Sequence, residues 1–320
     1  VRRRIQFVRR SISKIMIKWL RENRQMVARG LGSLLALALL LVLIQEEGDG
    51  ELFSAIRRVS LVYFLLALLA LLISRTFAAT RWFVLLRSAG VKIPLSRAIM
   101  LMFTGNFSSN FLPTTIGGDV VRLGGAMQMG YDRAICLASL VVDRLIGMAG
   151  MALALPLGLI PLFSLNGSLV QSFTLAGLFQ KGVDFGKRTF EAFSIWWKKP
   201  LGLSGALLST LGNQIFIYLM IYLLLQGIDH HVSFWLVAGM YTLTYFVTLV
   251  PISINGLGVQ ELSMTFLLVQ LGGLTSSESA TIALLTRLLF ILTSLPGAFF
   301  LPSILAAMNE KKVEIPESNG

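Results

Sequence analysis

Two arginines lie inside long apolar stretches of the sequence, where a charged side chain is costly. Arg144 lies in the stretch 135–155, and Arg287 lies in the stretch 281–301. An arginine at the centre of a membrane helix costs about 2.5–3.5 kcal/mol on insertion scales, and such residues usually pair or bind a ligand. We therefore interpret both arginines either as members of buried ion pairs or as binding groups for an anion such as phosphate.

Three carboxylates and a third arginine lie near these positions. Asp119 and Arg122 are three residues apart and share one face of a helix. Asp143 directly precedes one of the two membrane arginines but points about 100° away around the helix, which makes it an imperfect partner. Glu261 could pair with either of the two. The sequence leaves open whether such pairs only hold the helices in register or leave an arginine available to a phosphate.

Two proline-led, glycine-rich loops interrupt the apolar stretches next to these charges. Residues 113–119 read Pro-Thr-Thr-Ile-Gly-Gly-Asp, and residues 251–258 read Pro-Ile-Ser-Ile-Asn-Gly-Leu-Gly. Irregular backbone at membrane depth survives only where it is buried in protein or lines a wet cavity, and paired broken helices indicate a transport site. Glycines let the backbone approach a ligand, and the helix start after each loop offers free N–H groups to an anion.

The candidate lipid- or anion-binding residues therefore come from the arginines and the two loops. They are Arg122, Arg144, Arg287, Asn110, Thr114, Gly117, Gly118, Ser253, Asn255, Gly256 and Gly258, with Asp119, Asp143 and Glu261 as their charge partners. The polar loop side chains among them could instead only cap the half-helices.

The composition indicates an integral membrane protein. The 320 residues are 55% hydrophobic and 14% charged, with a mean hydropathy of +0.75, which is too apolar for a soluble domain. The formal charge of +12 is concentrated in residues 1–29, which hold ten Lys or Arg and one Glu. This segment reads as a basic amphipathic helix on an anionic leaflet, or as a solvated charge run that only sets orientation. Both interpretations place the N-terminus in the cytoplasm.

The positions of the apolar stretches predict an all-α, polytopic helix bundle with about eight hydrophobic segments, some of them broken or re-entrant. We expect spans at 30–45, 59–77, 135–155, 200–226, 233–250 and 281–301, a half-helix at 98–112, and half-helices after the loops at 119–129 and 261–271. Residues 156–180 remain open between a poor span and an interfacial excursion. The positive-inside rule assigns Arg81, Arg87, Lys92 and Arg97 to a cytoplasmic loop.

The two loops also suggest two pseudo-repeats. Each would consist of a half-helix, a loop, a second half-helix, a glycine-led turn and a span with an arginine. We expect a transmembrane domain at 30–308, flanked by the helix 1–29 and a C-terminal tail at 309–320. Inside the domain we expect repeat one at about 59–160, a cytoplasmic amphipathic helix at about 179–199 and repeat two at about 200–305. Whether the repeats are parallel or inverted depends on the undecided segment.

No pattern indicates catalysis, a metal or a cofactor. The single cysteine, Cys136, cannot form a disulfide within the chain. His230 and His231 are adjacent in a short loop, and we interpret them as a solvated pair rather than as metal ligands. We assign no catalytic residue, no cofactor and no nucleic-acid partner, and we expect the partner to be the membrane and its lipids.

Three ordered segments of the sequence resemble a known family. Residues 110–122 read Asn-Phe-Leu-Pro-Thr-Thr-Ile-Gly-Gly-Asp-Val-Val-Arg, residues 139–147 read Ser-Leu-Val-Val-Asp-Arg-Leu-Ile-Gly, and residues 251–261 extend the second loop to Glu261. Together they are similar to the membrane region of lysylphosphatidylglycerol synthases, including the stand-alone YbhN-like members, over roughly residues 30–305. Gln260 stands where the family often carries Arg, which removes one cation from the second loop.

The resemblance implies a bundle of about eight helices with re-entrant segments that handles lipids. In two-part members this region is associated with moving an aminoacylated phospholipid across the bilayer, while a separate soluble domain makes that lipid. We expect the present chain to correspond to the membrane part without the soluble transferase domain.

We therefore expect a multi-pass protein of the inner (plasma) membrane that transports or flips a phosphate-bearing lipid, whose head group could be aminoacylated or glycosylated, between its two repeats. The carboxylates would pair with the arginines or read a cationic head group. The alternative is the membrane part, or the partner, of a transferase that modifies lysyl-, glycosyl- or polyprenyl-lipids. A third interpretation is a lipid-binding scaffold without turnover. The sequence does not identify the lipid, the direction of transport or its energy source.

Overall fold

The computed structural model describes residues 59–112, 117–165, 200–250, 253–302 and 304. This part of the chain contains eight α-helices, two short 3₁₀ helices and no strand, which confirms the all-α prediction. The helices are, in chain order, α4 (Leu61–Ser88), α5 (Leu95–Ser109), α6 (Gly117–Gln128), α7 (Arg133–Leu165), α9 (Pro200–Gln226), α10 (Phe234–Thr248), η2 (Ile254–Gly256), α11 (Val259–Gly272), α12 (Ser276–Ser294) and η3 (Leu295–Phe299). The segments predicted at 1–29, 30–45, 179–199 and 309–320 lie outside the described residues.

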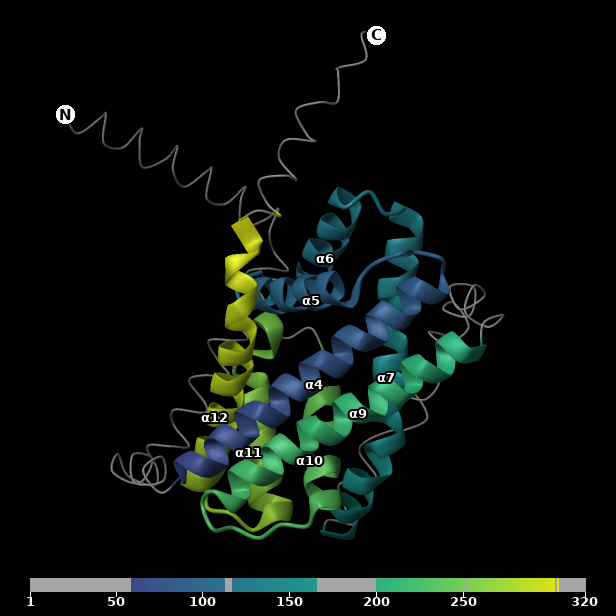
Figure 1. The fold of residues 1–320 in the computed structure, drawn as a ribbon. Helices are drawn as coiled ribbons and strands as arrows, with labels where there is room; N and C mark the ends of the chain where they lie inside the picture. Colours follow the sequence, from purple (N-terminus) through teal and green to yellow (C-terminus); the bar gives the residue numbers. More distant parts are fainter. Residues whose placement is uncertain (1–58, 113–116, 166–199, 251–252, 303, 305–320) are drawn as a thin grey trace, which may run out of the picture.

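Four helices are long and apolar enough to cross a membrane. They are α4, α7, α9, and α12 together with η3. Crossing a hydrocarbon core takes about 20 apolar residues, and each of the four exceeds that length. In Figure 1, α4 and α9 lie diagonally side by side, α12 lies at one edge and α7 at the other. The protein is therefore a polytopic helical membrane protein.

Helix α4 continues beyond the predicted end of its span. The expected span ended at Phe77, and Arg81 and Arg87 were assigned to the following loop, but the helix continues to Ser88. The assignment of Arg81 to a cytoplasmic loop is wrong, because this side chain is buried inside the bundle. The positive-inside rule counts arginines near helix ends, and it fails where an arginine instead has a buried carboxylate partner.

Helix α7 includes part of the segment that the sequence left undecided. It runs 33 residues, about 50 Å, and passes through Pro156 and Pro161 without interruption. Proline removes one backbone hydrogen bond, and membrane helices tolerate it because neighbouring helices and side chains satisfy the freed groups. Residues 156–165 are therefore part of a long span, whereas 166–180 lie outside the described residues.

Short helices adjoin both loops. Helix α5 and helix α10 have 15 residues each, about 22 Å, which is too short to cross the hydrocarbon core upright. The prediction of a full span at 233–250 is wrong for this reason. Helices α6 and α11 follow the loops close to their predicted positions. In Figure 1, α5 runs across the bundle, and α10 and α11 lie behind the pair formed by α4 and α9.

Small residues let α4 and α9 pack closely. Gly202, Gly205, Ser209 and Gly212 are spaced by three or four residues and therefore share one face of α9. A methyl group on Gly212 would lie 2.7 Å from the ring of Phe77, which is closer than real contacts allow. Small residues are the usual means of close helix packing in membranes, where no hydrophobic effect drives helices together.

The two long helices α4 and α9 run antiparallel. At one end the N–H of Ser60 donates to the carbonyl of Gly227 over 2.9 Å. At the other end Ser88, the last residue of α4, lies against Gly202 near the start of α9. Figure 1 shows the same course in opposite directions. This pair forms the centre against which the short helices are placed.

Glycines also mark the crossings of the shorter helices. The crossing of α5 with α6 brings Gly105 against Gly118, where a methyl group on Gly105 would lie 2.8 Å from the carbonyl oxygen of Gly118. Helices α7 and α10 cross at Gly158 and Gly239, where each glycine lies against the backbone of the other helix. These close approaches fix where the ends of the short helices lie.

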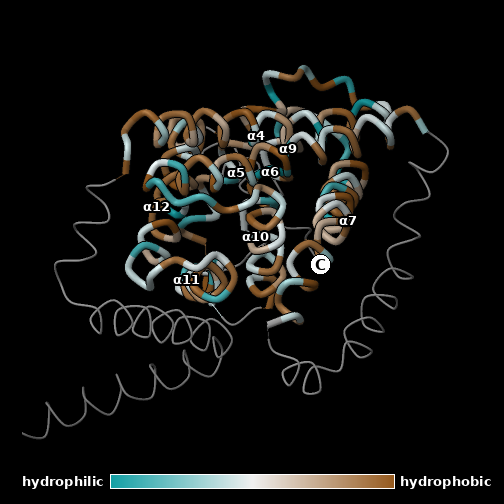
Figure 2. The backbone as a smooth tube through the Cα atoms, turned by 90° about the horizontal axis from the view of Figure 1, so that it is seen from below, coloured by the Kyte–Doolittle hydropathy of each residue, from teal (hydrophilic) through white to brown (hydrophobic). Residues whose placement is uncertain are grey.

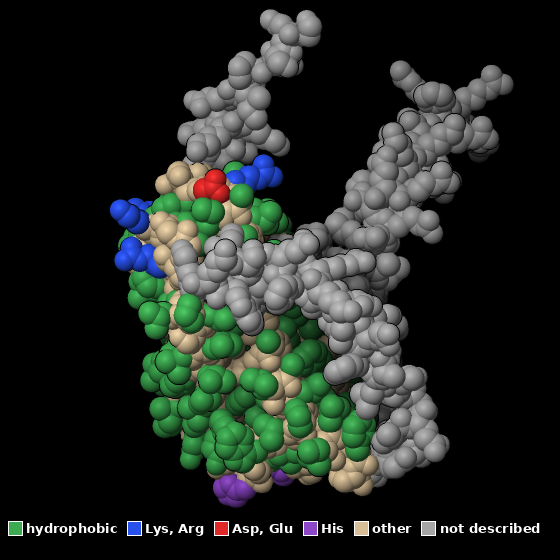
Figure 3. Space-filling model, turned by 90° about the vertical axis from the view of Figure 1, so that its right-hand side faces the viewer, with side chains coloured by type: hydrophobic (Ala, Val, Ile, Leu, Met, Phe, Trp, Pro, Cys, Tyr) green, Lys and Arg blue, Asp and Glu red, His purple; other side chains and the backbone are tan. Residues whose placement is uncertain are grey.

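The outer surface is apolar over most of its height. Leu61, Leu153 and Leu208 are 70–76% exposed, as expected for side chains that face lipid. Figure 2 shows that hydrophobic residues predominate along α4 and α9, with hydrophilic residues between them. In the face seen in Figure 3, lysine and arginine gather at one end of the molecule and histidine at the other, with an apolar band between them.

Candidate functional site

A polar cavity of about 380 Å³ lies where the broken helices meet. Its wall includes the C-terminal parts of α5 and α10, the start of α6, the residues that precede α11, and the middle parts of α4, α7 and α12. Five arginines line it: Arg75, Arg81, Arg122, Arg144 and Arg287. Arg75 is 14 residues from the start of α4 and 13 from its end, so this arginine lies about 20 Å along the helix axis from either end.

Asp143 is the centre of the first ion cluster. Its side chain is 3% exposed, and its Oδ1 accepts a hydrogen bond from Arg81 Nε over 2.6 Å. Its Oδ2 accepts from Arg122 Nη2 over 3.3 Å. The Arg122 guanidinium also lies over the ring of Trp82 at 4.3 Å, in a cation–π contact. The aspartate thus joins α4, α6 and α7.

Asp119 extends this cluster toward the open side of the cavity. Arg122 Nη1 donates to Asp119 Oδ1 over 3.0 Å, which is the pairing that the three-residue spacing predicted. Arg144 Nε donates to the other oxygen of Asp119. The side chain of Arg144 is 42% exposed, so this arginine lies at the rim rather than in the interior. Two carboxylates therefore share three arginines.

Glu261 forms a second, separate ion pair. Its Oε1 accepts from Arg287 Nε, which settles the choice between two arginines that the sequence left open. Its Oε2 accepts from the N–H of Gly258 over 2.7 Å, which caps the start of α11. Arg287 Nη1 also donates to the carbonyl of Asn255 over 3.5 Å. The glutamate side chain is 2% exposed and lies behind the arginine.

The two ion clusters have the same plan. In each, a carboxylate in the first turn of the helix after the loop pairs with an arginine of the next long helix. Asp119 of α6 pairs with Arg144 of α7, and Glu261 of α11 pairs with Arg287 of α12. A carboxylate at a helix N-terminus is also stabilised by the helix dipole. The arginines on the long helices thereby hold the starts of the short helices at the cavity.

The structure places the predicted loop residues in different surroundings. Those that line the cavity are Asn110, Asn255 and Gly256, together with the arginines and aspartates. Asn255 and Gly256 have φ of +50° and +72°, a left-handed conformation that Asn and Gly adopt most readily. Asn110 Nδ2 donates to Ser294 Oγ over 2.8 Å. Thr114 lies outside the described residues.

Five of the described predicted residues are not in the cavity wall, and one of them is Glu261, which lies behind Arg287. Gly118 lies against Gly105 and Ser109 of α5, and Gly117 lies against Leu112. These two glycines serve helix packing, because a side chain at either position would overlap its neighbour. Gly258 directly precedes the first residue of α11, and Ser253 is buried beside η2.

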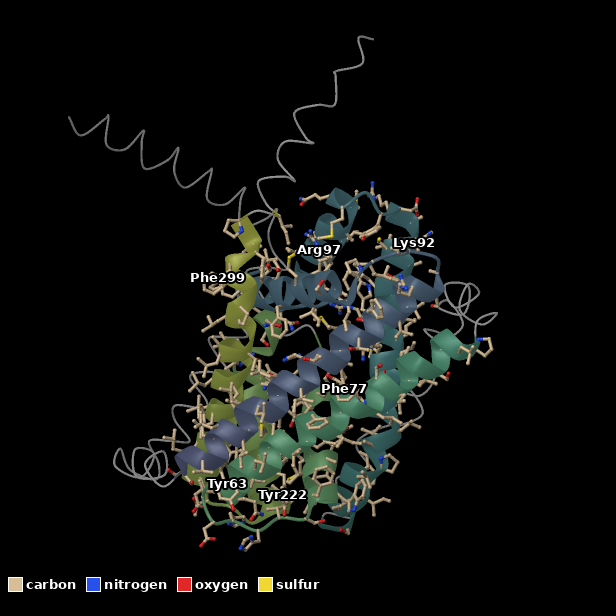
Figure 4. The ribbon with its side chains drawn as sticks, viewed as in Figure 1. Tyr63, Phe77, Lys92, Arg97, Tyr222 and Phe299 are labelled. Carbon is tan, nitrogen blue, oxygen red and sulfur yellow. The ribbon has the colours of Figure 1, made fainter. Side chains whose placement is uncertain are left out.

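Sequence reasoning missed two arginines of the cavity. Arg81 was placed in a loop, and Arg75 was not considered. Arg75 lies within the apolar run Leu71-Leu-Ile-Ser-Arg-Thr-Phe77, so the rule that singled out the two other membrane arginines applies to it equally. It would have been found by treating every charge inside a span in the same way. Figure 4 shows the side chains of this region between Phe77 and the basic end marked by Lys92 and Arg97.

The two histidines considered above, and Asn213 of α9, have partners within the protein. His230 Nε2 lies 3.1 Å from the carbonyl oxygen of Gly272, and His231 Nδ1 lies 3.1 Å from the side-chain oxygen of Gln226. Asn213 accepts a hydrogen bond from Ser74 over 2.9 Å, which joins α9 to α4. Within the segments that the structure describes, no group of three histidine, cysteine or acidic side chains could hold a metal ion.

Comparison with known proteins identifies the family. A search of curated proteins found no match to the chain. The family model of the lysylphosphatidylglycerol synthase TM region matches residues 30–183 and 172–297. These two segments cover most of the chain, including all the helices that form the cavity. The protein therefore belongs to the lysylphosphatidylglycerol synthase transmembrane-region family.

Proposed function

We propose that the protein is a lipid transporter that moves a phosphate-bearing head group between the two leaflets, and that the cavity binds this head group. The observation that carries the proposal is the cavity at the mid-length of α4, lined by five arginines. Among the described residues, three carboxylates, namely Asp119, Asp143 and Glu261, pair with four of these arginines. Charge held at this depth is costly unless it binds something or forms part of a polar pathway.

The size and shape of the cavity suit a head group. Its volume lies within the range of about 300–1,000 Å³ that is usual for small-molecule sites. A phospholipid head group fits such a space, while its acyl chains would stay against the apolar outer surface. The bilayer core offers no hydrogen-bond partners, so a polar chamber at mid-depth lowers the barrier to head-group crossing.

The charges at the two ends of the molecule support a cytoplasmic location for the C-terminal end of α4. Arg87, Lys92, Arg97 and Arg133 lie where α4 ends and where α5 and α7 begin. At the opposite end, the described residues 225–235 and 270–280 contain Asp229 and Glu278 but no Lys or Arg. By the positive-inside rule the basic end faces the cytoplasm. The charged and histidine-bearing ends are visible in Figure 3.

Lipid movement in reconstituted vesicles tests the proposal. The purified protein is placed in vesicles that contain a trace of phosphatidylglycerol with a fluorescent acyl chain, and a membrane-impermeant quencher reports how much of it changes leaflet. We expect movement that depends on the protein. Arg144→Ala should reduce the rate by about tenfold or more, because removing a rim arginine weakens the attraction for an anion.

The matched control is Arg133→Ala, which removes an exposed arginine from the start of the same helix. It should leave the rate unchanged. If wild-type protein binds the lipid but leaves it in its original leaflet, the protein is a scaffold and not a transporter. If Arg144→Ala moves lipid at the wild-type rate, Arg144 has only a structural role.

A further inference from the structure

Arg75 differs from the other four arginines of the cavity. It lies in the middle of α4, and its guanidinium carbon is 5.0 Å from the ring centre of Phe290 on α12. In the described part of the chain, no carboxylate lies within ion-pair distance of it, whereas each of the other four is bonded to a carboxylate. An arginine without an anion at this depth is a costly charge.

The two carboxylates that line the cavity and the one behind its wall already bind other groups. Asp143 binds two arginines, and Asp119 binds two. Glu261 binds one arginine and the N–H of Gly258. Among the described residues, five arginines against three carboxylates leave an excess of two positive charges. A cationic group that entered the cavity would meet this excess and would have to displace an arginine to reach a carboxylate.

The unsatisfied groups of the cavity wall are all donors. The buried side-chain atoms without a hydrogen-bond partner among the described cavity residues are Arg122 Nε, Arg287 Nη2, Asn106 Nδ2 and Gln260 Nε2. Arg122 is 5% exposed, so water compensates little for its missing acceptor. A buried donor without an acceptor is costly, and a ligand that brings acceptor oxygens removes that cost. Phosphate oxygens are such acceptors.

We propose, on the basis of the proposed transport function, that the cavity selects lipids whose head group is net anionic, that the phosphate binds Arg75, and that net cationic head groups are excluded. Phosphatidylglycerol is then a ligand and lysylphosphatidylglycerol is not. The ammonium groups of the lysyl moiety outnumber the single phosphate, so the aminoacylated lipid brings a positive charge to a positive cavity. Arg75 is the natural phosphate contact because it alone needs no exchange of partners.

The first test compares lipids in the wild-type protein. Vesicles carry fluorescent phosphatidylglycerol, fluorescent lysylphosphatidylglycerol or fluorescent phosphatidylcholine, and the rate of leaflet exchange is measured for each. We expect phosphatidylglycerol to move at least about tenfold faster than lysylphosphatidylglycerol, which corresponds to the loss of one charge-assisted contact. Equal rates for the two lipids, or a faster rate for the lysyl lipid, overturn the selectivity.

The second test changes Arg75. Arg75→Gln should lower the rate of leaflet exchange of phosphatidylglycerol by about tenfold or more. It should also reduce the difference in exchange rate between phosphatidylglycerol and lysylphosphatidylglycerol. Arg75→Lys keeps the charge and should retain part of the rate. The matched control is Arg87→Gln, an exposed arginine near the end of the same helix, which should change neither rate. If Arg75→Gln leaves rate and selectivity at wild-type values, Arg75 is not the phosphate contact.

A third test distinguishes a lipid phosphate from free phosphate as the ligand of the cavity. Inorganic phosphate is added to both sides of the vesicles at millimolar concentration. We expect no inhibition, because the acyl chains of a lipid add binding that free phosphate lacks. Strong inhibition would mean that a soluble anion is the ligand, and it would overturn the lipid assignment. Absence of movement for every lipid would instead contradict the proposed transport function itself.

Discussion

At the residue scale, Asp143 does the most to hold the charges of the cavity in place. One carboxylate satisfies Arg81 and Arg122 from two other helices while it is 3% exposed. A buried ion pair contributes little net stability compared with a well-packed apolar pair, but removing one member leaves an uncompensated buried charge. For Asp143 the removal would leave two such charges.

Asp143→Ala should lower the free energy of unfolding by about 3–5 kcal/mol. The measurement is thermal or denaturant unfolding of the protein in detergent. The control is Asp132→Asn at the start of the same helix, where Asp132 Oδ1 accepts from the N–H of Ile135 and an asparagine oxygen can do the same. Equal stability of both variants would show that water in the cavity compensates the two arginines.

At the element scale, the short helices are positioned by glycine contacts rather than by large apolar faces. Gly118 in the first turn of α6 lies against the carbonyl oxygen of Gly105 and against Ser109, so the two helices touch through backbone. This contact places Asp119, the next residue, at the cavity. A substitution there acts on the site through the position of the whole helix.

Gly118→Ala should therefore destabilise the protein by about 1–3 kcal/mol, because the added methyl group overlaps backbone that cannot move aside. It should also reduce lipid movement, since α6 carries Asp119 and Arg122. Gly205→Ala on α9 is the comparison, because its methyl group would meet a side chain and not backbone, with Val84 Cγ1 at 3.2 Å. A Gly118→Ala protein as stable and active as Gly205→Ala would mean that α5 and α6 are not held by this contact.

At the scale of the whole molecule, the first long helices of the two halves, α4 and α9, run in opposite directions. We propose that the halves 59–160 and 200–305 are repeats of inverted topology. The antiparallel course of α4 and α9 and the matching ion pairs of Asp119 with Arg144 and of Glu261 with Arg287 support this. In transporters, inverted repeats place the substrate site at their interface, where the cavity lies.

The orientation in the membrane can be measured with single cysteines. The chain has one cysteine, Cys136, which is buried, and Cys136→Ala provides a background without thiols. In that background Arg97→Cys should react with an impermeant maleimide only from the cytoplasmic side, and Asp229→Cys only from the opposite side, because the basic end faces the cytoplasm. The reverse pattern would contradict the proposed orientation, and labelling of both positions from one side would contradict the span count between them.

The sequence by itself determined the membrane class, the all-α fold, the family and the positions of both broken regions. Hydropathy and proline–glycine breaks are local properties, and the bilayer converts them directly into helices and interruptions. The helix Pro200–Gln226 was predicted to the residue for this reason. The pairing of Asp119 with Arg122 was also local, because it depends only on helical spacing.

The tertiary structure alone decided which charges meet. Arg81 is separated from Asp143 by 62 residues, and no spacing rule connects them; only the packing of α4 on α7 brings the two together. The same packing leaves Arg75 without a carboxylate, since none of the described neighbouring helices places one beside it. Whether a buried arginine is neutralised or available to a ligand depends on its three-dimensional neighbours, because electrostatic attraction depends on distance in space and not on separation along the chain.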